Sequence, residues 1–180
     1  MIDTERLQLR HFCGSEKEIR EMLKNWISDP AVQHEYGEPV YDSFLSVQDL
    51  MERYVSEPYR WAICEKKSGE CIGQIALCRV WDDVRTAEIE YCIGSGFQGN
   101  RYAGEALQAV IDYVFTHTAF EKLEAYHRKA NPRSGNVLRK SSMHPTDTVE
   151  RFRRQGLSPE DEICYCITVS EWQGKSNRSC

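Results

Sequence analysis

The stretch from Ala87 to Leu107, AEIEYCIGSGFQGNRYAGEAL, decides the fold. Over positions 87–93, apolar side chains alternate with Glu88, Glu90 and Cys92. This period of two predicts a strand with one apolar face, because successive side chains of a strand point to opposite sides. The two carboxylates are therefore expected to share the other face of that strand.

Glycines interrupt the pattern directly after the strand. Gly94, Gly96 and Gly99 predict a turn, and from Ala103 apolar residues recur at helical spacing to about Thr118. The first backbone N–H groups of such a helix have no partner in the helix and lie at the positive end of its dipole. The order of strand, glycine turn and helix therefore predicts an anion-binding loop that suits a pyrophosphate.

This loop also resembles that of a known family. Gln98 to Ala103, QGNRYA, is similar to the [QR]-x-x-G-x-[GA] acetyl-CoA loop of the GNAT N-acetyltransferase superfamily. Ala87-Glu88-Ile89 stands where the preceding strand of that family often carries a glutamate base. The chain departs from the pattern at Arg101, which replaces the second glycine of the family, where glycine usually lets the backbone approach the phosphates closely.

Further segments resemble the GNAT branch that includes the ribosomal-protein N-terminal acetyltransferases. In chain order they are TERLQLR at 4–10, Asp29-Pro30, NPRSGNVLRK at 131–140 and SEW at 170–172. The chain departs from this branch at Leu138, where many GNAT enzymes have a tyrosine, and at Ser142-Met143, where the branch usually has Gly-Phe. Together the matching segments extend over nearly the whole chain.

The resemblance implies an α/β protein with the GNAT (acyl-CoA N-acyltransferase) fold, in which helices flank a mixed central sheet. The sheet is expected to splay at the cofactor cleft, between the strands at Glu88 and Leu123, to admit the pantetheine arm. A chain of 180 residues suits one domain, which buries about 70% of the surface of its unfolded state. We expect residues 1–172 to form a single acetyltransferase domain and 173–180 a C-terminal tail.

Composition narrows the classes of partner. The 28 acidic and 23 basic residues give a formal charge of −5, which argues against a mainly electrostatic nucleic-acid binder. No apolar run approaches the ~20 residues of a membrane span, and Met1-Ile2-Asp3 opens on a charge rather than on a signal sequence. We therefore expect a cytoplasmic protein, a monomer or a homodimer, with neither nucleic acid nor membrane as partner.

The eight cysteines are predicted to be free structural thiols. The chain has no Cys-x-x-Cys pair, and its five histidines are scattered, so we expect no metal. Most of the cysteines fall inside predicted strands and should pack as small apolar residues: Cys64, Cys71, Cys78, Cys92, Cys164 and Cys166. Cys13 and Cys180 are expected to be the exposed ones.

Patterning predicts the remaining elements. Strands are expected at 5–12, 60–63, 70–80 and 122–128, and helices at 16–26 with Ser15 as N-cap, at 47–55 and after Asn131. Residues 29–44 are predicted to be a loop. Residues 148–154 and 162–169 are predicted to close the sheet as an antiparallel pair around Gln155-Gly156, with Arg151, Arg153 and Arg154 as a solvated strand face.

Acetyl transfer to an amine needs a proton acceptor, a polarised thioester carbonyl and a stabilised leaving thiolate. Glu88 is the candidate base, directly or through water, because repulsion between two carboxylates on one face raises the pKa of at least one of them. A carboxylate that only solubilises the strand is the alternative, and Glu90 is the second candidate. For the carbonyl, the resemblance implies the backbone N–H of Cys92 at a strand bulge.

The segment after Asn131 offers groups for the thiolate and the pantetheine arm. Ser134 is assigned to cofactor binding first and to proton donation second, with an N-cap of the short helix as alternative. Asn131 is expected to hydrogen-bond the pantetheine amide, with a simple turn residue as alternative. The cofactor-binding set that the resemblance implies is Cys92, Ile93, Gln98, Gly99, Asn100, Arg101, Tyr102, Ala103, Gly104, Asn131 and Ser134.

The expected activity is transfer of an acetyl group from acetyl-CoA to a primary amine, by direct attack in a ternary complex. The amine is a small molecule or a protein N-terminus. Arg101 and Leu138 also suggest an alternative, an acyl-CoA-binding module without turnover. A partner-binding domain that has lost the cofactor is a further alternative.

Two groups of side chains bear on the acceptor site. Glu35, Glu38 and Asp42 lie near Tyr36, Tyr41 and Trp26, and carboxylates beside aromatic faces suit a cationic amine. A solvated acidic loop is the alternative. His127 alternates with apolar residues and is predicted to be a core or cleft-wall residue rather than a base.

Overall fold

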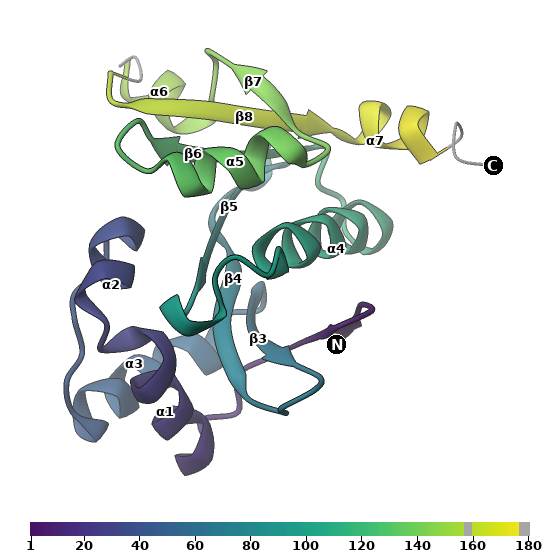
Figure 1. Ribbon diagram of the computed structural model, residues 1–180. Helices are drawn as coiled ribbons and strands as arrows, with labels where there is room; N and C mark the ends of the chain where they lie inside the picture. The colour runs from purple at the N-terminus through teal and green to yellow at the C-terminus, as the bar shows by residue number, and fades with distance from the viewer. Residues whose placement is uncertain (157–159, 177–180) are drawn as a thin grey trace. The chain divides into compact units, whose positions relative to one another are not determined.

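The computed structural model describes residues 1–156 and 160–176, and Figure 1 traces the chain through its helices and strands. An eight-stranded sheet has the order β1-β2-β3-β4-β5-β6-β8-β7. The β5–β6 pair is parallel, whereas β6 and β8 are antiparallel, so the sheet is mixed as expected. The chain divides into two compact units, Met1–Ala76 with Tyr91–Ala109, and Leu77–Glu90 with Val110–Cys180.

The strands are β1 (Ile2–Asp3), β2 (Leu7–Arg10), β3 (Arg60–Glu65), β4 (Cys71–Trp81), β5 (Thr86–Ile93), β6 (Lys122–Arg128), β7 (His144–Thr146) and β8 (Glu162–Thr168). The α-helices are α1 (Glu16–Met22), α2 (Pro30–Tyr36), α3 (Phe44–Ser56), α4 (Tyr102–His117), α5 (Pro132–Lys140), α6 (Glu150–Gln155) and α7 (Val169–Ser176). Shorter turns of other pitch are η1 (Leu23–Ile27), η2 (Asp82–Val84) and η3 (Ser95–Phe97). Helix α7 crosses the boundary at 172 where the C-terminal tail was expected to begin, and 177–180 lie outside the described residues.

The core of the first unit forms around α1, η1 and α3. Trp26 and Met22 are fully buried there, with Val47 and Leu50 of α3 against them. Helix α1 begins where the sequence predicts, because the Ser15 hydroxyl accepts the amide of Glu18 at 3.3 Å. The following π-helical turn η1 carries the helical segment to Ile27 and buries Asn25 and Trp26.

The loop prediction for 29–44 is wrong, because α2 lies within it. Its start has an Asp29 carboxylate that accepts the amides of Ala31 and Val32, and Pro30 in the first turn. Its end has Gly37 at φ 87°, the left-handed conformation that closes helices. Both signals are present in the sequence, since proline favours the first turn and glycine the position after the last.

The predicted strand at 148–154 is also wrong. Residues Glu150–Gln155 form α6, which ends at Gly156 with φ 65°. Strand β8 pairs instead with β6 and with β7, which the sequence pattern missed. The N-terminus of α6 is capped from a distance, since the Glu124 carboxylate of β6 accepts the Glu150 amide at 2.9 Å. The residue at the N-cap position itself, Val149, has no side-chain acceptor, so the sequence lacks a local signal for the start of this helix.

Strand β5 differs from the one-faced strand that its alternation predicts. Glu88 is 2% exposed, so it is not a solvated surface carboxylate. The β5–β6 ladder pairs Thr86, Ala87 and Glu88 with Lys122, Leu123 and Glu124. Both strands continue beyond the three residue pairs of this ladder.

The described cysteines are all free thiols, as predicted. Cys13 is exposed, Cys78 is partly buried, and the others lie buried in β3, β4, β5 and β8. Cys180 lies outside the described residues. In the described part of the chain, no helix has both the length and the hydropathy of a membrane span.

Candidate active site

Close packing fixes the end of β5 in the first unit. The Gly94 amide donates to the Ile72 carbonyl at 2.9 Å, and a Cβ on Gly94 would lie 2.2 Å from the backbone oxygen of Asn25. Only glycine leaves room for that oxygen. Turn η3 follows, and the Gln98 side chain reaches back to donate to the Ile93 carbonyl at 3.0 Å. Gln98 therefore braces the loop against the strand.

The loop between η3 and α4 presents unpaired backbone donors. Within the described residues, the amides from Gly99 to Gly104 have no hydrogen-bond acceptor, whereas the Glu105 amide donates to the Arg101 carbonyl. Gly99 has φ 82°, and a Cβ on Gly99 or Gly104 would meet nothing within 4 Å. These donors lie at the start of the 16-residue helix α4, whose dipole adds positive potential. The loop thus fits a pyrophosphate such as that of coenzyme A.

Arg101 adopts a conformation that explains why the family has glycine here. Its φ is 66°, in the left-handed region that costs most residues roughly 1–2 kcal/mol. Its side chain is exposed and forms no ion pair within the described part of the chain. Arg101 therefore keeps the backbone shape of the glycine and adds a guanidinium beside the open amides.

The candidate base Glu88 lies in the second unit, inside a network of charges. One carboxylate oxygen accepts from the Arg79 guanidinium, and the other accepts from Arg151 Nε at 3.2 Å. Arg151 in turn forms an ion pair with Glu162. The thiol of Cys78 lies 3.6 Å from the carboxylate oxygen that Arg79 binds.

Burial raises the pKa of Glu88 above its usual range, while Arg79 and Arg151 oppose that rise. The direction agrees with the sequence expectation, but the main cause is burial rather than repulsion by Glu90. Tyr126 of β6 belongs to the same environment, since Arg151 lies 4.4 Å from its ring centroid. Burial and then the charge of Glu88 raise the pKa of the Tyr126 phenol.

The segment after β6 places Asn131 at the start of α5. Its side-chain oxygen accepts the Ser134 amide at 3.1 Å, so the N-cap of this helix is Asn131 and not Ser134. The Asn131 backbone amide donates to the Arg128 carbonyl at 2.8 Å, whereas its side-chain nitrogen donates to no group within the described residues. Leu138 is fully buried, so no polar side chain occupies the position of the family tyrosine.

Glu88 and Ser134 lie on opposite sides of the sheet in the second unit. Glu88 is the register partner of Glu124, whose carboxylate faces α6. His127 points to the other side of β6, where a Cβ on Gly135 of α5 would stand 2.7 Å from its ring. His127 is buried there as predicted, and its Nδ1 donates to the Arg128 carbonyl at 2.9 Å. The structure therefore does not bring the two predicted catalytic side chains together.

The predicted acceptor segment is only partly a surface loop. Trp26 is fully buried, and the Tyr36 hydroxyl accepts from Gln74 at 3.2 Å, so both belong to the packing of the first unit. Glu35 and Asp42 are exposed and Glu38 is partly exposed. The acidic side chains therefore remain accessible to solvent, on a segment whose aromatic side chains Trp26 and Tyr36 pack against the first unit.

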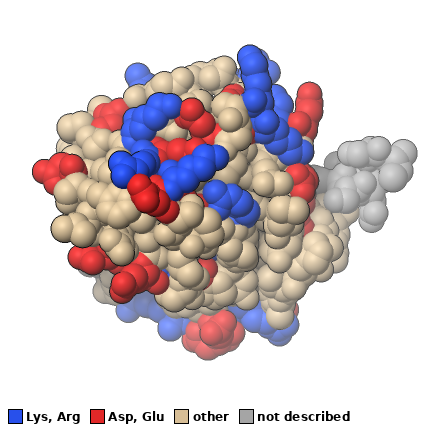
Figure 2. Space-filling model, turned by 90° about the horizontal axis from the view of Figure 1, so that it is seen from below, with Lys and Arg blue, Asp and Glu red and all other residues tan. Residues whose placement is uncertain are grey.

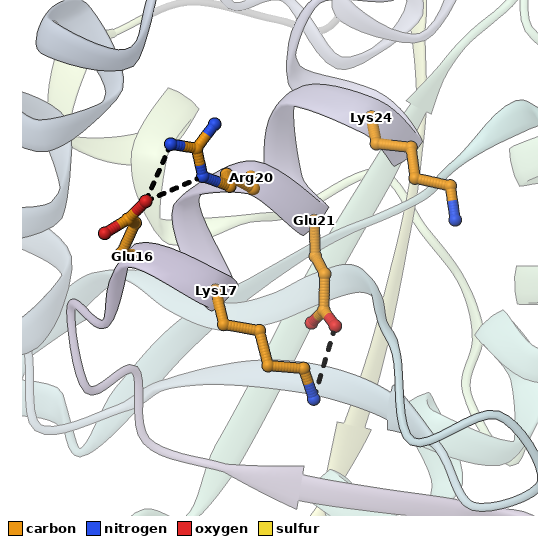
Figure 3. A pocket seen from close by; sticks show the side chains of 5 residues that line it. All are labelled: Glu16, Lys17, Arg20, Glu21 and Lys24. Carbon is orange, nitrogen blue, oxygen red and sulfur yellow. Dashed lines mark hydrogen bonds and ion pairs between the residues drawn. The ribbon is translucent and has the colours of Figure 1, made fainter.

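Charged side chains of opposite sign lie beside one another on the face drawn in Figure 2. A hollow runs along α1 and the start of η1 (Figure 3). Its lining side chains are all charged: Glu16, Lys17, Arg20, Glu21 and Lys24. Arg20 pairs with Glu16 at 2.6 Å and Lys17 with Glu21 at 3.5 Å, one helical turn apart. This hollow has none of the predicted site residues. Its charges are paired, four of them along the helix and Lys24 with Glu70 at 2.9 Å.

Sequence patterns missed the partners of Glu88. Arg79 follows the buried part of β4, and Arg151 was assigned to a solvated strand, yet both contact the buried carboxylate. A signal was available for Arg79, because register across neighbouring strands can bring a basic side chain beside Glu88. Among the described residues, no group of three or more His, Cys, Asp or Glu side chains could hold a metal ion.

Known proteins resemble this chain in sequence and in fold over most of its length. The uncharacterized N-acetyltransferase p20 of Bacillus licheniformis is 28% identical over 95% of this chain and 97% of its own. The spermidine N(1)-acetyltransferase of Escherichia coli K12 is 24% identical over 85% of this chain and 75% of its own. The fold matches that of spermidine N-acetyltransferase from Vibrio cholerae in complex with CoA and spermine, with a TM-score of 0.74, 17% identity and coverage of 94% and 99%.

The family assignment rests on a match to a family model. Residues 6–144 match the Acetyltransferase (GNAT) domain, a range that includes β5, the loop of open amides, α4 and the segment after Asn131. With this match and with named N-acetyltransferases among its relatives, the chain belongs to the GNAT family of acyl-CoA-dependent acetyltransferases.

Proposed function

We propose that this protein transfers an acetyl group from acetyl-CoA to the primary amine of a small molecule, by direct attack in a ternary complex. The observation that carries this proposal is the run of backbone amides from Gly99 to Gly104 without an internal acceptor. A protein rarely leaves backbone donors unpaired unless water or a ligand accepts from them. The four non-bridging oxygen atoms of a pyrophosphate diester suit such a row at a helix N-terminus.

The residues that would hold the cofactor follow from their donors. The amides of Gly99–Gly104 would bind the pyrophosphate, and the Arg101 guanidinium would add a charge-assisted hydrogen bond to it. The side-chain amide nitrogen of Asn131 would donate to a carbonyl group of the pantetheine arm. The backbone N–H of Cys92 would donate to the thioester carbonyl. When bound, acetyl-CoA supplies the activated acetyl group as a thioester.

Glu88 is proposed to accept the amine proton, directly or through a water molecule. A base must be ionised to act, and the guanidinium groups of Arg79 and Arg151 favour the ionised carboxylate. Burial disfavours the ionised form and raises the pKa of Glu88, so the ionised carboxylate binds a proton more strongly than an exposed glutamate does. The neutral amine then attacks the thioester carbonyl carbon, the C–N bond forms, and the C–S bond breaks.

The departing sulfur must gain a proton or a hydrogen bond. Ser134, in the first turn of α5, is proposed to donate a hydrogen bond from its hydroxyl to the sulfur as part of cofactor binding. Because Ser134 lies in the first turn, it is close to the positive N-terminal end of the α5 dipole, which stabilises negative charge. The substrate ammonium thus gives one proton to Glu88 before attack, and the nitrogen loses a second proton after attack. The second proton goes to the thiolate of coenzyme A, directly or through water, and Glu88 returns the first to solvent.

A polyamine is the first acceptor to test. Relatives that cover most of this chain carry the name spermidine N(1)-acetyltransferase. The exposed carboxylates Glu35 and Asp42 and the partly exposed Glu38 suit an extended cation. Release of coenzyme A thiol should be measured with spermidine, spermine, single amino acids, aminoglycosides and short peptides with a free N-terminus. Thiol release with polyamines alone supports the small-molecule proposal, and release with peptides alone overturns it in favour of N-terminal acetylation.

A second experiment tests the cofactor site itself. Calorimetry should show that coenzyme A binds far more tightly than pantetheine, which lacks the phosphates. Equal affinities would contradict the proposal, because the open amides would then contribute nothing.

One alternative function has its own observation. Leu138 is buried at the position where many members of the family have a tyrosine, so the leaving thiolate lacks that acid. An acyl-CoA-binding module without turnover would bind coenzyme A in calorimetry and release no thiol with any amine of the panel.

A further inference from the structure

The N-terminal segment makes contacts that its role as an edge of the sheet does not need. Thr4 and Arg6, which precede β2, both bind Glu105 in the first turn of α4. The Thr4 hydroxyl donates to one carboxylate oxygen at 2.5 Å, and the Arg6 backbone amide donates to the same oxygen at 2.9 Å. Arg6 Nε donates to the other oxygen at 2.8 Å. This carboxylate therefore fastens the chain start to the helix that begins at the open amides.

Arg6 also reaches the loop itself. Its Nη1 donates to the backbone carbonyl of Asn100 at 3.0 Å. A trans peptide points its C=O and its N–H in opposite directions, so this bond fixes the direction of the Arg101 N–H. The Arg101 amide is one of the open donors, and it therefore points away from the Arg6 guanidinium.

The same peptide is the strained one. Arg101 has φ 66°, and rotation of the Asn100–Arg101 peptide is the natural way for a residue other than glycine to relieve such a conformation. A charge-assisted hydrogen bond on the Asn100 carbonyl opposes that rotation. The Tyr102 ring adds a second restraint, since the Arg6 guanidinium lies 4.8 Å from its centroid and its hydroxyl donates to Glu65.

We propose that Arg6 is a positioning residue for cofactor binding: it holds the Asn100–Arg101 peptide so that the Arg101 amide faces the pyrophosphate. The inference rests on the proposed function of the loop and adds to it a residue far away in the sequence. Arg6 acts through the peptide and does not itself touch the cofactor. Its loss should raise the KM for acetyl-CoA and leave kcat nearly unchanged, since the transition state and the ground state share the pyrophosphate contact.

Arg6→Ala and Glu105→Gln form a matched pair of variants. Both break the ion pair between Arg6 and Glu105, but only Arg6→Ala removes the bond to the Asn100 carbonyl. Arg6→Ala should weaken coenzyme A binding about tenfold or more, the usual effect of losing a hydrogen bond to a charged group. Glu105→Gln should leave binding unchanged or slightly stronger, because it removes a negative charge near an anion.

Calorimetry with coenzyme A and the KM for acetyl-CoA are the readouts, with thermal unfolding of both variants as the check on folding. An equal loss of affinity in both variants would show that the ion pair merely supports the helix and would overturn the inference. The affinity ratio between wild type and Arg6→Ala should persist in about 1 M salt, where the Debye length is ~3 Å. A ratio that falls to one in high salt would mean that Arg6 acts only as a distant charge.

A further outcome concerns the proposed function rather than Arg6. Wild-type protein that fails to bind coenzyme A at all removes the premise of the cofactor site. Wild-type protein that binds, with Arg6→Ala binding equally well, leaves the site intact and rejects the positioning role.

Discussion

The backbone oxygen of Asn25 lies against the Cα of Gly94, so closely that a Cβ there would stand 2.2 Å away. Asn25 belongs to the π-helical turn η1, and Gly94 is the residue that follows β5. The Asn25 side chain also donates to the Cys71 carbonyl at 2.7 Å, which ties η1 to β4. The route of the chain into the loop of open amides therefore depends on a backbone contact that any side chain would block.

Gly94→Ala should destabilise the protein by about 1–3 kcal/mol, the usual cost of forcing an added methyl group into a packed site. The matched control is Gly96→Ala, two positions later, because a Cβ there would meet nothing within 4 Å. Urea unfolding measures both variants. Equal free energies of unfolding for Gly94→Ala and wild type would mean that η1 can move away at no cost.

Glu88→Gln should lower kcat by about a hundredfold or more and leave affinity for coenzyme A nearly unchanged, as expected for the loss of a general base. Wild-type activity should fall as the pH drops through the pKa of Glu88, which lies above that of an ordinary glutamate. In the variant this acidic limb should disappear. Glu90→Gln is the control on the same strand face, and a full rate for Glu88→Gln between pH 6 and 9 would leave Glu88 a structural carboxylate.

Arg101→Gly should raise the free energy of unfolding by about 0.5–1 kcal/mol, because glycine adopts a φ of 66° without strain but loses more backbone entropy. Arg101→Ala keeps the strain and removes the guanidinium, so it should bind coenzyme A more weakly, with the difference from wild type shrinking as salt rises. Calorimetry at two salt concentrations checks this. Much tighter binding by Arg101→Gly than by wild type would identify the side chain as an obstruction.

Glu150 should contribute stability that acid removes. Hydrogen bonds from Arg153 and Arg154 lower the pKa of its carboxyl to about 2. A lowered pKa in the folded state stabilises the protein at every pH above the unfolded value, and this contribution is lost as the pH falls from about 5 to about 2. Thermal unfolding should therefore separate wild type from Glu150→Gln at pH 7 and bring them together near pH 2. A gap that stays constant with pH would contradict the assignment.

The strands and long helices of this chain could be predicted because their signals are local. Residues 122–128 form β6 with the predicted bounds, and α4 ends at His117, next to the predicted limit at Thr118. The loop of open amides was predictable for the same reason, since a strand, glycines and an amphipathic helix follow one another directly. The sequence also marked α2 through Asp29, Pro30 and Gly37, although the segment was assigned to a loop.

What could not be predicted depends on contacts between distant residues. Helix α6 lacks a local cap, because its acceptor is the Glu124 carboxylate on β6. The burial of Glu88 is equally remote in origin, since Arg151 of α6 covers a strand that alternation alone describes as half exposed. Sequence patterns therefore identified Glu88 as a carboxylate of interest but neither its burial nor the guanidinium groups that bind it.

Helix α6 has a consequence for the order in which the protein assembles. Its six residues are far fewer than the ~12–15 that an isolated helix needs to persist in water. Its cap comes from β6 and its contact to Glu88 from β5, and those strands must already lie side by side to offer both carboxylates at once. We therefore expect the segment Glu150–Gln155 to become helical during folding only after the parallel β5–β6 pair has formed. Glu88, which we assign to proton transfer, should therefore stay exposed to solvent until α6 forms and Arg151 covers it.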